Sequence, residues 1–182
     1  MARDIIVRQL GIADLDAYFQ LRLRGLAEHP EAFGKSYAEA LASGPEQYRP
    51  TLEGRTADEG RFILGASLED SGDGTLREGA LVGTVGLIRE QNERGRHKAS
   101  VVAMYVASEA AGRGVGRALL EALLARAARV DGLRQVQLVV SSTNLAARGL
   151  YESLGFVAYG HERESMRVGD TFYDADLMAY FL

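Results

Sequence analysis

A glycine-rich turn at residues 112–116 is the feature that most constrains the fold of this chain. The turn follows a predicted apolar strand at residues 99–106 and leads into a predicted helix at residues 114–130, whose apolar residues share one face. Residues 136–140 then form a continuous apolar run, which is typical of a buried parallel strand. This order predicts a strand–helix–strand crossover with bare backbone N–H groups at the helix N-terminus, where an anion can bind.

The remaining sequence predicts an α/β fold with the element order βααβββαβαββ, in one domain spanning residues 1–182. The length of 182 residues and the hydrophobic content of 47% fit a single domain with a sizeable core. The predicted strands lie at residues 5–7, 61–68, 80–89, 99–106, 136–140, 156–159 and 172–182, and the predicted helices at residues 14–27, 31–42, 114–130 and 144–154. Predicted connections occupy residues 43–60, 69–79, 91–95 and 160–170.

Composition excludes several classes of function. The formal net charge of −4 and the pI near 5.5 argue against a general nucleic-acid binder. The sequence has no cysteine, so disulfides, thiolate metal sites and cysteine nucleophiles are excluded. His29, His97 and His161 are scattered without a paired carboxylate, so we expect neither a metal site nor a Ser-His-Asp triad. No signal peptide or membrane-spanning run is evident, and we expect a cytoplasmic protein without nucleic-acid or membrane partners.

The glycine-rich turn differs from the two commonest nucleotide-binding loops. A P-loop requires Gly-Lys followed by Ser or Thr at the start of the helix, whereas this chain has Gly116, Arg117 and Ala118. The dinucleotide pattern Gly-x-Gly-x-x-Gly fails as well, because its third glycine falls on Arg117 or on Leu119. Arg113 and Arg117 flank the turn and favour an anionic ligand, with a purely structural turn as the alternative.

A second segment at residues 144–156 adds a short helix that carries Asn144 and Tyr151 and is followed by Gly155, which can adopt the left-handed conformation that ends a helix. Together, the turn and this helix resemble motifs A and B of the GNAT superfamily of N-acetyltransferases. Those motifs read Gln/Arg-x-x-Gly-x-Gly/Ala and Asn-x-x-Ala-x-x-Leu-Tyr-x-x-x-Gly-Phe. The matching residues are Gly114 and Gly116 in the first motif and Asn144, Ala147, Leu150, Tyr151, Gly155 and Phe156 in the second. Ala111 departs from the pattern, because it stands where the family has Gln or Arg.

The resemblance implies a GNAT-like fold, in which helices flank a mixed, mostly antiparallel central sheet of about six or seven strands. It also implies acetyl-CoA as cosubstrate, with the pyrophosphate on backbone amides of the turn and the pantetheine arm along the preceding strand. A helix cap alone would also explain Asn144. The expected cofactor-binding residues are Met104, Tyr105, Val106, Ala111, Gly112, Arg113, Gly114, Val115, Gly116, Arg117, Asn144 and Arg148.

Acetyl transfer to an amine requires an uncharged nucleophile, stabilisation of charge on the thioester oxygen and a proton for the departing thiolate. The resemblance assigns that proton to Tyr151, for which a purely structural aromatic residue is the alternative. It assigns stabilisation of the oxygen to backbone N–H groups near Tyr105 and Val106. With no cysteine, we expect direct transfer rather than a thiol-linked acyl-enzyme.

The general base stays open. Some family members carry a glutamate at positions that fall near Ser100 or Val139 here, and neither residue can take a proton at neutral pH. The remaining candidates are Glu90, Glu28 and His97, and an amine with some neutral fraction needs no dedicated base.

The expected function is transfer of the acetyl group to a primary amine of a small molecule or a peptide. The acidic net charge mildly favours a cationic amine or a peptide N-terminus. In the family, the two early helices line the acceptor site, so Glu28, Phe33 and Tyr37 are expected acceptor contacts, together with Tyr173 of the last hairpin. Dimerisation through the C-terminal strands is common in the family and makes a homodimer a further expectation. The alternatives are a non-catalytic acyl-CoA-binding or sensing module and an interaction domain with a structural turn.

Overall fold

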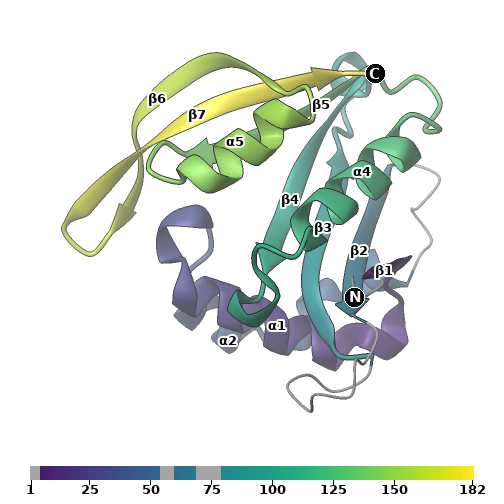
Figure 1. Cartoon of the computed structure of the whole chain (residues 1–182), viewed down its shortest axis with the longest axis vertical. Helices are drawn as coiled ribbons and strands as arrows, with labels where there is room; N and C mark the ends of the chain where they lie inside the picture. Colours follow the sequence, from purple (N-terminus) through teal and green to yellow (C-terminus); the bar gives the residue numbers. More distant parts are fainter. Residues whose placement is uncertain (1–4, 54–59, 69–78) are drawn as a thin grey trace.

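A seven-stranded mixed sheet organises the chain in the computed structural model, which describes residues 5–53, 60–68 and 79–182 (Figure 1). Its strands follow the order β1-β2-β3-β4-β5-β7-β6, and every neighbouring pair is antiparallel except β4 and β5, which are parallel. The predicted mixed, mostly antiparallel sheet is thereby confirmed. The strands are β1 (Ile5–Gln9), β2 (Arg61–Leu68), β3 (Leu81–Arg89), β4 (Lys98–Val106), β5 (Gln135–Ser141), β6 (Val157–Val168) and β7 (Thr171–Phe181).

Helices cover both faces of this sheet. The described helices are α1 (Leu15–Glu28), α2 (Tyr37–Ser43), α3 (Arg49–Leu52), α4 (Val115–Ala127) and α5 (Leu145–Ser153). In β2, Phe62 and Leu64 belong to the core beneath α4, whereas Ile63 packs with Tyr18 of α1 and Leu52 of α3. Successive strand side chains point to opposite faces, so β2 contributes to two cores. Among the residues described, no helix combines the length and the apolar character needed to cross a membrane.

The second helix begins later than the predicted residue 31. Pro30 starts a 3₁₀ turn, Pro30–Ala32, and the chain becomes helical again only at α2. Ser36 caps this helix, because its Oγ accepts a hydrogen bond from Glu39 N at 3.2 Å while the Glu39 carboxylate accepts one from Ser36 N at 2.8 Å. This reciprocal capping box determines where the helix starts.

The C-terminal hairpin is much longer than predicted. β6 was expected at residues 156–159 but continues to Val168, and with β7 it extends beyond the rest of the sheet (Figure 1). β6 is an edge strand whose side chains are mostly exposed. Its charged sequence therefore lacks the apolar pattern from which a strand is predicted. The register shifts between Glu162 and Met166, where Glu164 has a φ of 54°. The predicted connection at residues 69–79 lies outside the described residues except for Gly79.

Candidate active site

A cleft opens where the parallel strands β4 and β5 separate. The two strands pair over only three positions, from Lys98 with Gln135 to Ser100 with Gln137. Beyond that point both strands continue without each other, and a cavity of about 510 Å³ lies between them. Its wall is formed by Arg22, His29, Ala32, Phe33, Gly34, Val101, Val102, Ala103, Met104, Tyr105, Val106, Leu138, Val139, Val140, Ser141, Asn144, Ala146, Ala147, Leu150 and Tyr151.

The edge of β4 that faces the cleft has unpaired backbone groups. Residues 101–106 have no strand partner on the β5 side, so every second N–H and C=O along this edge is available to a ligand. A bulge accentuates the opening: the β3–β4 register shifts between Thr84 and Gly86, and Ala103 has a φ of 53°. Thr84 Oγ1 donates a hydrogen bond of 2.9 Å to the carbonyl of Ala103 and holds the bulge in place. An extended ligand can therefore add to β4 as a strand would.

The glycine-rich turn after β4 forms an anion-binding helix N-terminus. Gly112 and Gly114 have φ values of 71° and 86°, in the left-handed region that favours glycine. The first helical hydrogen bond of α4 runs from Ala118 N to Gly114 O at 3.0 Å, so the preceding N–H groups of residues 115–117 have no helical acceptor. The turn therefore fits a diphosphate, which such a helix end binds through its N–H groups and its dipole.

The side chains and amides around the turn differ in their availability. The N–H of Ala111 already donates to Ser108 O at 3.2 Å within the preceding 3₁₀ turn. Arg117 donates to Ser153 Oγ at 2.7 Å and thus connects α4 to α5. Arg113 is exposed beside the turn. The amides of residues 115–117 and the exposed Arg113 are the groups that these contacts leave available, and the expected anion contacts at this turn stay predictions.

Two expected functional residues of α5 line the cleft. Asn144 Oδ1 accepts a hydrogen bond from Ala147 N at 3.1 Å, so Asn144 is the N-cap of α5. Tyr151 is buried against Phe156, with ring centroids 5.8 Å apart, and burial raises the pKa of its hydroxyl to about 12. A phenol with that pKa stays protonated at neutral pH and is able to donate a proton. The helix ends at Gly155, whose φ of 100° agrees with the predicted left-handed stop.

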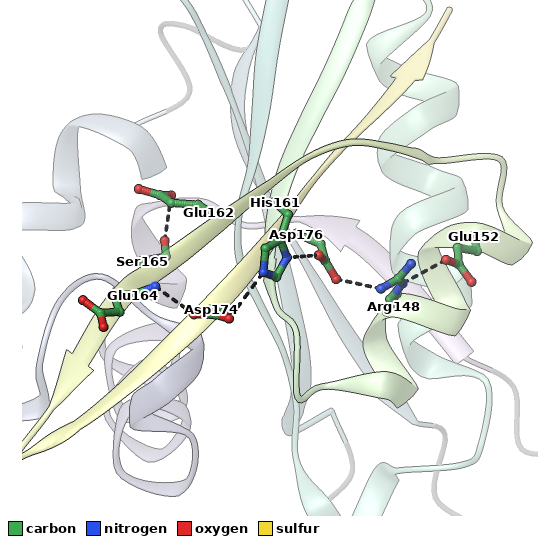
Figure 2. Close-up of polar contacts among 8 residues, drawn as sticks. All are labelled: Arg148, Glu152, His161, Glu162, Glu164, Ser165, Asp174 and Asp176. Carbon is green, nitrogen blue, oxygen red and sulfur yellow. Dashed lines mark hydrogen bonds and ion pairs between the residues drawn. The ribbon is translucent and has the colours of Figure 1, made fainter.

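Arg148, an expected cofactor contact, instead joins a polar network between α5 and the β6–β7 hairpin (Figure 2). Its guanidinium donates to Asp176 of β7 at 2.8 Å and to Glu152 at 3.0 Å. Asp176 also contacts His161 Nδ1 at 2.8 Å, and His161 Nε2 lies 3.3 Å from Asp174. The hydrogen bond between His161 and Asp176 raises the pKa of His161 and lowers the pKa of Asp176. This network attaches α5 to the hairpin, and Arg148 does not line the cleft.

A second network connects the α1 side of the cleft to the turn that precedes the glycines. Tyr105 donates a hydrogen bond of 2.6 Å to Glu28, and Arg24 donates to the same carboxylate at 2.7 Å. Arg24 also donates twice to Glu109, at 2.8 and 2.7 Å. The hydrogen bond from Tyr105 is the largest influence that lowers the pKa of Glu28, while Arg24 lowers that of Glu109 to about 2. Glu28 is thus a paired carboxylate that holds Tyr105, with reduced basicity.

The other expected residues lie in different places. Phe33 lines the cleft, whereas Tyr37 on α2 and Tyr173 on β7 do not. Glu90 lies beside Lys98, its N–H donating to the Lys98 carbonyl at 3.0 Å, and this is the closed end of the β4–β5 pair. Met104 lies six positions beyond Lys98 along the strand, which corresponds to roughly 20 Å. His97 is exposed at the same closed end, where its carbonyl accepts from residues 134 and 135.

Sequence reasoning missed His29 as a cleft residue. It follows α1 directly, lines the cleft beside Phe33, and its ring lies 6.3 Å from that of Tyr105. The available signal was the His29-Pro30 pair, which ends the helix and turns the chain toward β5 and β6. No Asp or Glu is found among the cleft-lining residues that the structure describes.

The mixed sheet and the cleft between its two separating parallel strands match the fold of an acyltransferase family. The model of the acetyltransferase (GNAT) family matches residues 36–156, and the chain belongs to this family. Members of this family use acetyl-CoA as cosubstrate.

Similar proteins extend this comparison. Mycothiol acetyltransferase of Beutenbergia cavernae is 37% identical over 123 residues, which is 65% of this chain but only 38% of the length of that relative. An acetyltransferase of the GNAT family from Streptococcus pneumoniae superposes with a TM-score of 0.84 at 22% identity, covering 98% of this chain and all of the other. The yncA structure from Salmonella typhimurium, which contains its cofactor acetyl-CoA, has a TM-score of 0.78 at 19% identity and covers 98% of this chain and 94% of yncA.

Proposed function

We propose that this chain transfers the acetyl group of acetyl-CoA directly to a primary amine of a small molecule or a peptide. The cleft carries the proposal, because it places the unpaired edge of β4 opposite Tyr151 and leads toward the glycine-rich helix N-terminus. Family membership supports the acetyl donor. The sequence contains no cysteine, which supports transfer without a thiol-linked intermediate.

Main-chain groups hold the donor in this proposal. Acetyl-CoA, when bound, supplies an acetyl thioester to the cleft. The N–H groups of Val115, Gly116 and Arg117 bind the diphosphate, and the free edge of β4 hydrogen-bonds the pantetheine arm as an added strand. N–H groups near Tyr105 and Val106 donate to the carbonyl oxygen, on which charge develops as the amine nitrogen bonds to the acyl carbon.

Side chains move the protons. Tyr151 donates its proton to the sulfur as the carbon–sulfur bond breaks, a role that a buried, neutral phenol in the cleft can perform. The amine loses its own proton to His29, directly or through water, because the described wall of the cleft carries no carboxylate. Glu28 acts as a positioning residue through Tyr105, and Glu90 has no part in this proposal.

A free-thiol assay tests the proposal. Acetyl-CoA is incubated with the protein and with amino acids, polyamines, aminoglycosides or peptides with free N-termini, and release of CoA thiol is followed together with the mass of the product. We expect at least one class of amine to gain an acetyl group. Binding of CoA without thiol release across the whole panel would instead favour a non-catalytic acyl-CoA-binding module.

A further inference from the structure

A second cavity of about 280 Å³ adjoins the cleft on the α1 side of β4. It shares Arg22, Val102 and Ala103 with the cleft, so the two spaces meet at the β4 bulge. The remaining wall comes from α1, the segment around α2 and α3, and the strands β2 and β3. It is formed by Tyr18, Lys35, Gln47, Tyr48, Thr51, Arg61, Phe62, Ile63 and Ile88.

The charge of this side cavity is opposite to that of the whole chain. Arg22 and Lys35 lie on its wall, and no Asp or Glu is found among its described lining residues. The chain as a whole has a net charge of −4, which alone favours a cationic acceptor. A ligand next to the bulge interacts mainly with the charges that lie close to it, and here these charges favour an anion.

Arg22 has hydrogen-bonding capacity that no described residue uses. Its Nη1 is buried and has no partner among the residues described, and its guanidinium lies 4.2 Å from the centroid of the Phe33 ring. The Phe33 ring orients the guanidinium of Arg22, but it accepts no hydrogen bond from the N–H groups that point outward in the guanidinium plane. A buried donor without an acceptor is unfavourable, and an anionic ligand would satisfy it.

Lys35 adds a second positive charge to the wall of the side cavity. Its Nζ donates to Gln47 and to Ser43 Oγ, the latter at 3.1 Å, and both acceptors are neutral. An ammonium group has three donors, so one remains for a ligand. Gln47 is itself anchored to the carbonyls of residues 40 and 44, which fixes the position of Lys35 at the wall.

We propose that the side cavity is an anion subsite for the acceptor, and that the acceptor is a small amine that also carries a carboxylate, such as a free amino acid. This inference rests on the proposed amine acetylation. The carboxylate binds Arg22 and Lys35, and the amine reaches past Ala103 into the cleft. A free amino acid suits the cavity because only a short chain separates its two charged groups, whereas the N-terminus of a long peptide lacks a neighbouring carboxylate.

Matched substrate pairs test this subsite in the unaltered protein. The standard L-amino acids and their carboxamides are compared in the free-thiol assay, with spermidine and O-phosphoethanolamine as further amines. We expect kcat/KM for the preferred amino acid to exceed that of its carboxamide by about tenfold or more. The carboxamide has the less basic amine and thus the larger neutral fraction, so such a preference cannot arise from deprotonation.

Variants then assign the effect to residues. Arg22→Gln and Lys35→Met should each raise KM for the preferred amino acid by about tenfold while the Kd of acetyl-CoA stays unchanged. Arg49→Gln is the matched control, because the Arg49 side chain is 43% exposed, pairs with Glu46 and lines neither cavity. The amino acid should also raise the Tm of the unaltered protein and leave that of Arg22→Gln unchanged, which provides a readout independent of turnover.

The outcomes separate this inference from the proposed function. Carboxamides or spermidine reacting as well as the amino acids would overturn the carboxylate subsite but leave amine acetylation standing. A clear preference for O-phosphoethanolamine would replace the carboxylate by a phosphate. Absence of thiol release with every amine would remove the proposed function itself.

Discussion

The two sides of β4 present different chemistry to a ligand. Toward β5, the strand and the following turn offer main-chain groups: an unpaired strand edge and the bare N–H groups at the start of α4. Toward α1, the wall consists of side chains that differ in charge and shape, and the cations Arg22 and Lys35 are among them. Main-chain recognition tolerates most substitutions, because every residue except proline supplies an N–H. Side-chain recognition sets specificity and changes with each substitution.

Tyr151→Phe should have the largest effect and tests whether the β5 side also performs chemistry. Loss of the phenolic hydroxyl removes the proposed acid, so we expect kcat to fall by about 100-fold. The Kd of acetyl-CoA should change little, since the ring and its contact with Phe156 remain. Steady-state kinetics and isothermal titration calorimetry measure the two quantities.

Tyr159→Phe is the control for that experiment. Tyr159 lies on β6, is 56% exposed and does not line the cleft, so the same chemical change there should leave kcat unaltered. An unchanged kcat for Tyr151→Phe would reduce Tyr151 to a core aromatic residue and confine the β5 side to binding.

Gly25→Ala should break the packing on the α1 side. A Cβ at this position would lie 2.9 Å from Tyr105 Cγ, so the ring must move or α1 must shift. We expect the free energy of unfolding to fall by about 1–3 kcal/mol, as for other overpacked sites. Urea denaturation measures this, and Gly149→Ala serves as control because nothing lies within 4 Å of its added Cβ. Equal stabilities of the two variants would show that Tyr105 is free to move.

Gly114→Ala should weaken the main-chain site. Gly114 has a φ of 86°, and an alanine in this conformation costs about 1–2 kcal/mol, so the turn relaxes away from its binding geometry. We expect the Kd of acetyl-CoA to rise by up to about tenfold. Gly11→Ala is the control, since Gly11 has a φ of −122° and open space around it. Unchanged affinity in Gly114→Ala would mean that the turn conformation does not determine binding.

The glycine-rich turn and the helix α5 could be predicted from the sequence because the signals for both are local. A strand, a glycine-rich turn and a helix occupy adjacent residues, and Asn144, Tyr151 and Gly155 lie within one short helix and its end. Each of these features depends on backbone conformation or helical spacing, which neighbouring residues determine.

The side-chain sites depend on contacts between distant segments, which one sequence does not reveal. Tyr105 and Glu28 are 77 positions apart, and Arg24 and Glu109 are 85 apart. Glu90 was a plausible base until the strand register placed it at the closed end of the β4–β5 pair. The predicted length of β6 is too short for a related reason. Residues at this edge of the sheet form a strand because they pair with β7, and they show no apolar pattern that would predict it.

His161→Asn should have the smallest effect and asks whether side chains also stabilise the β5 side. His161 contacts Asp176 and Asp174, and Asp176 also pairs with Arg148 of α5. Folding raises the pKa of His161, so its contribution is fully present below the unfolded value near 6.5 and is lost as the pH rises through the folded value. Folding lowers the pKa of Asp176, so that contribution is present above about 3.8 and is lost as the pH falls through the folded value.

The destabilisation by His161→Asn should therefore be larger at pH 6 than at pH 8.5. Because the imidazole is half exposed and its charge is screened by solvent, we expect this destabilisation to be small at either pH. Urea denaturation at the two pH values measures the difference, and His97→Asn, at an exposed position whose carbonyl alone is engaged, is the control. A difference independent of pH would show that His161 contributes packing rather than charge, leaving Arg148 and Asp176 as the connection between α5 and the hairpin.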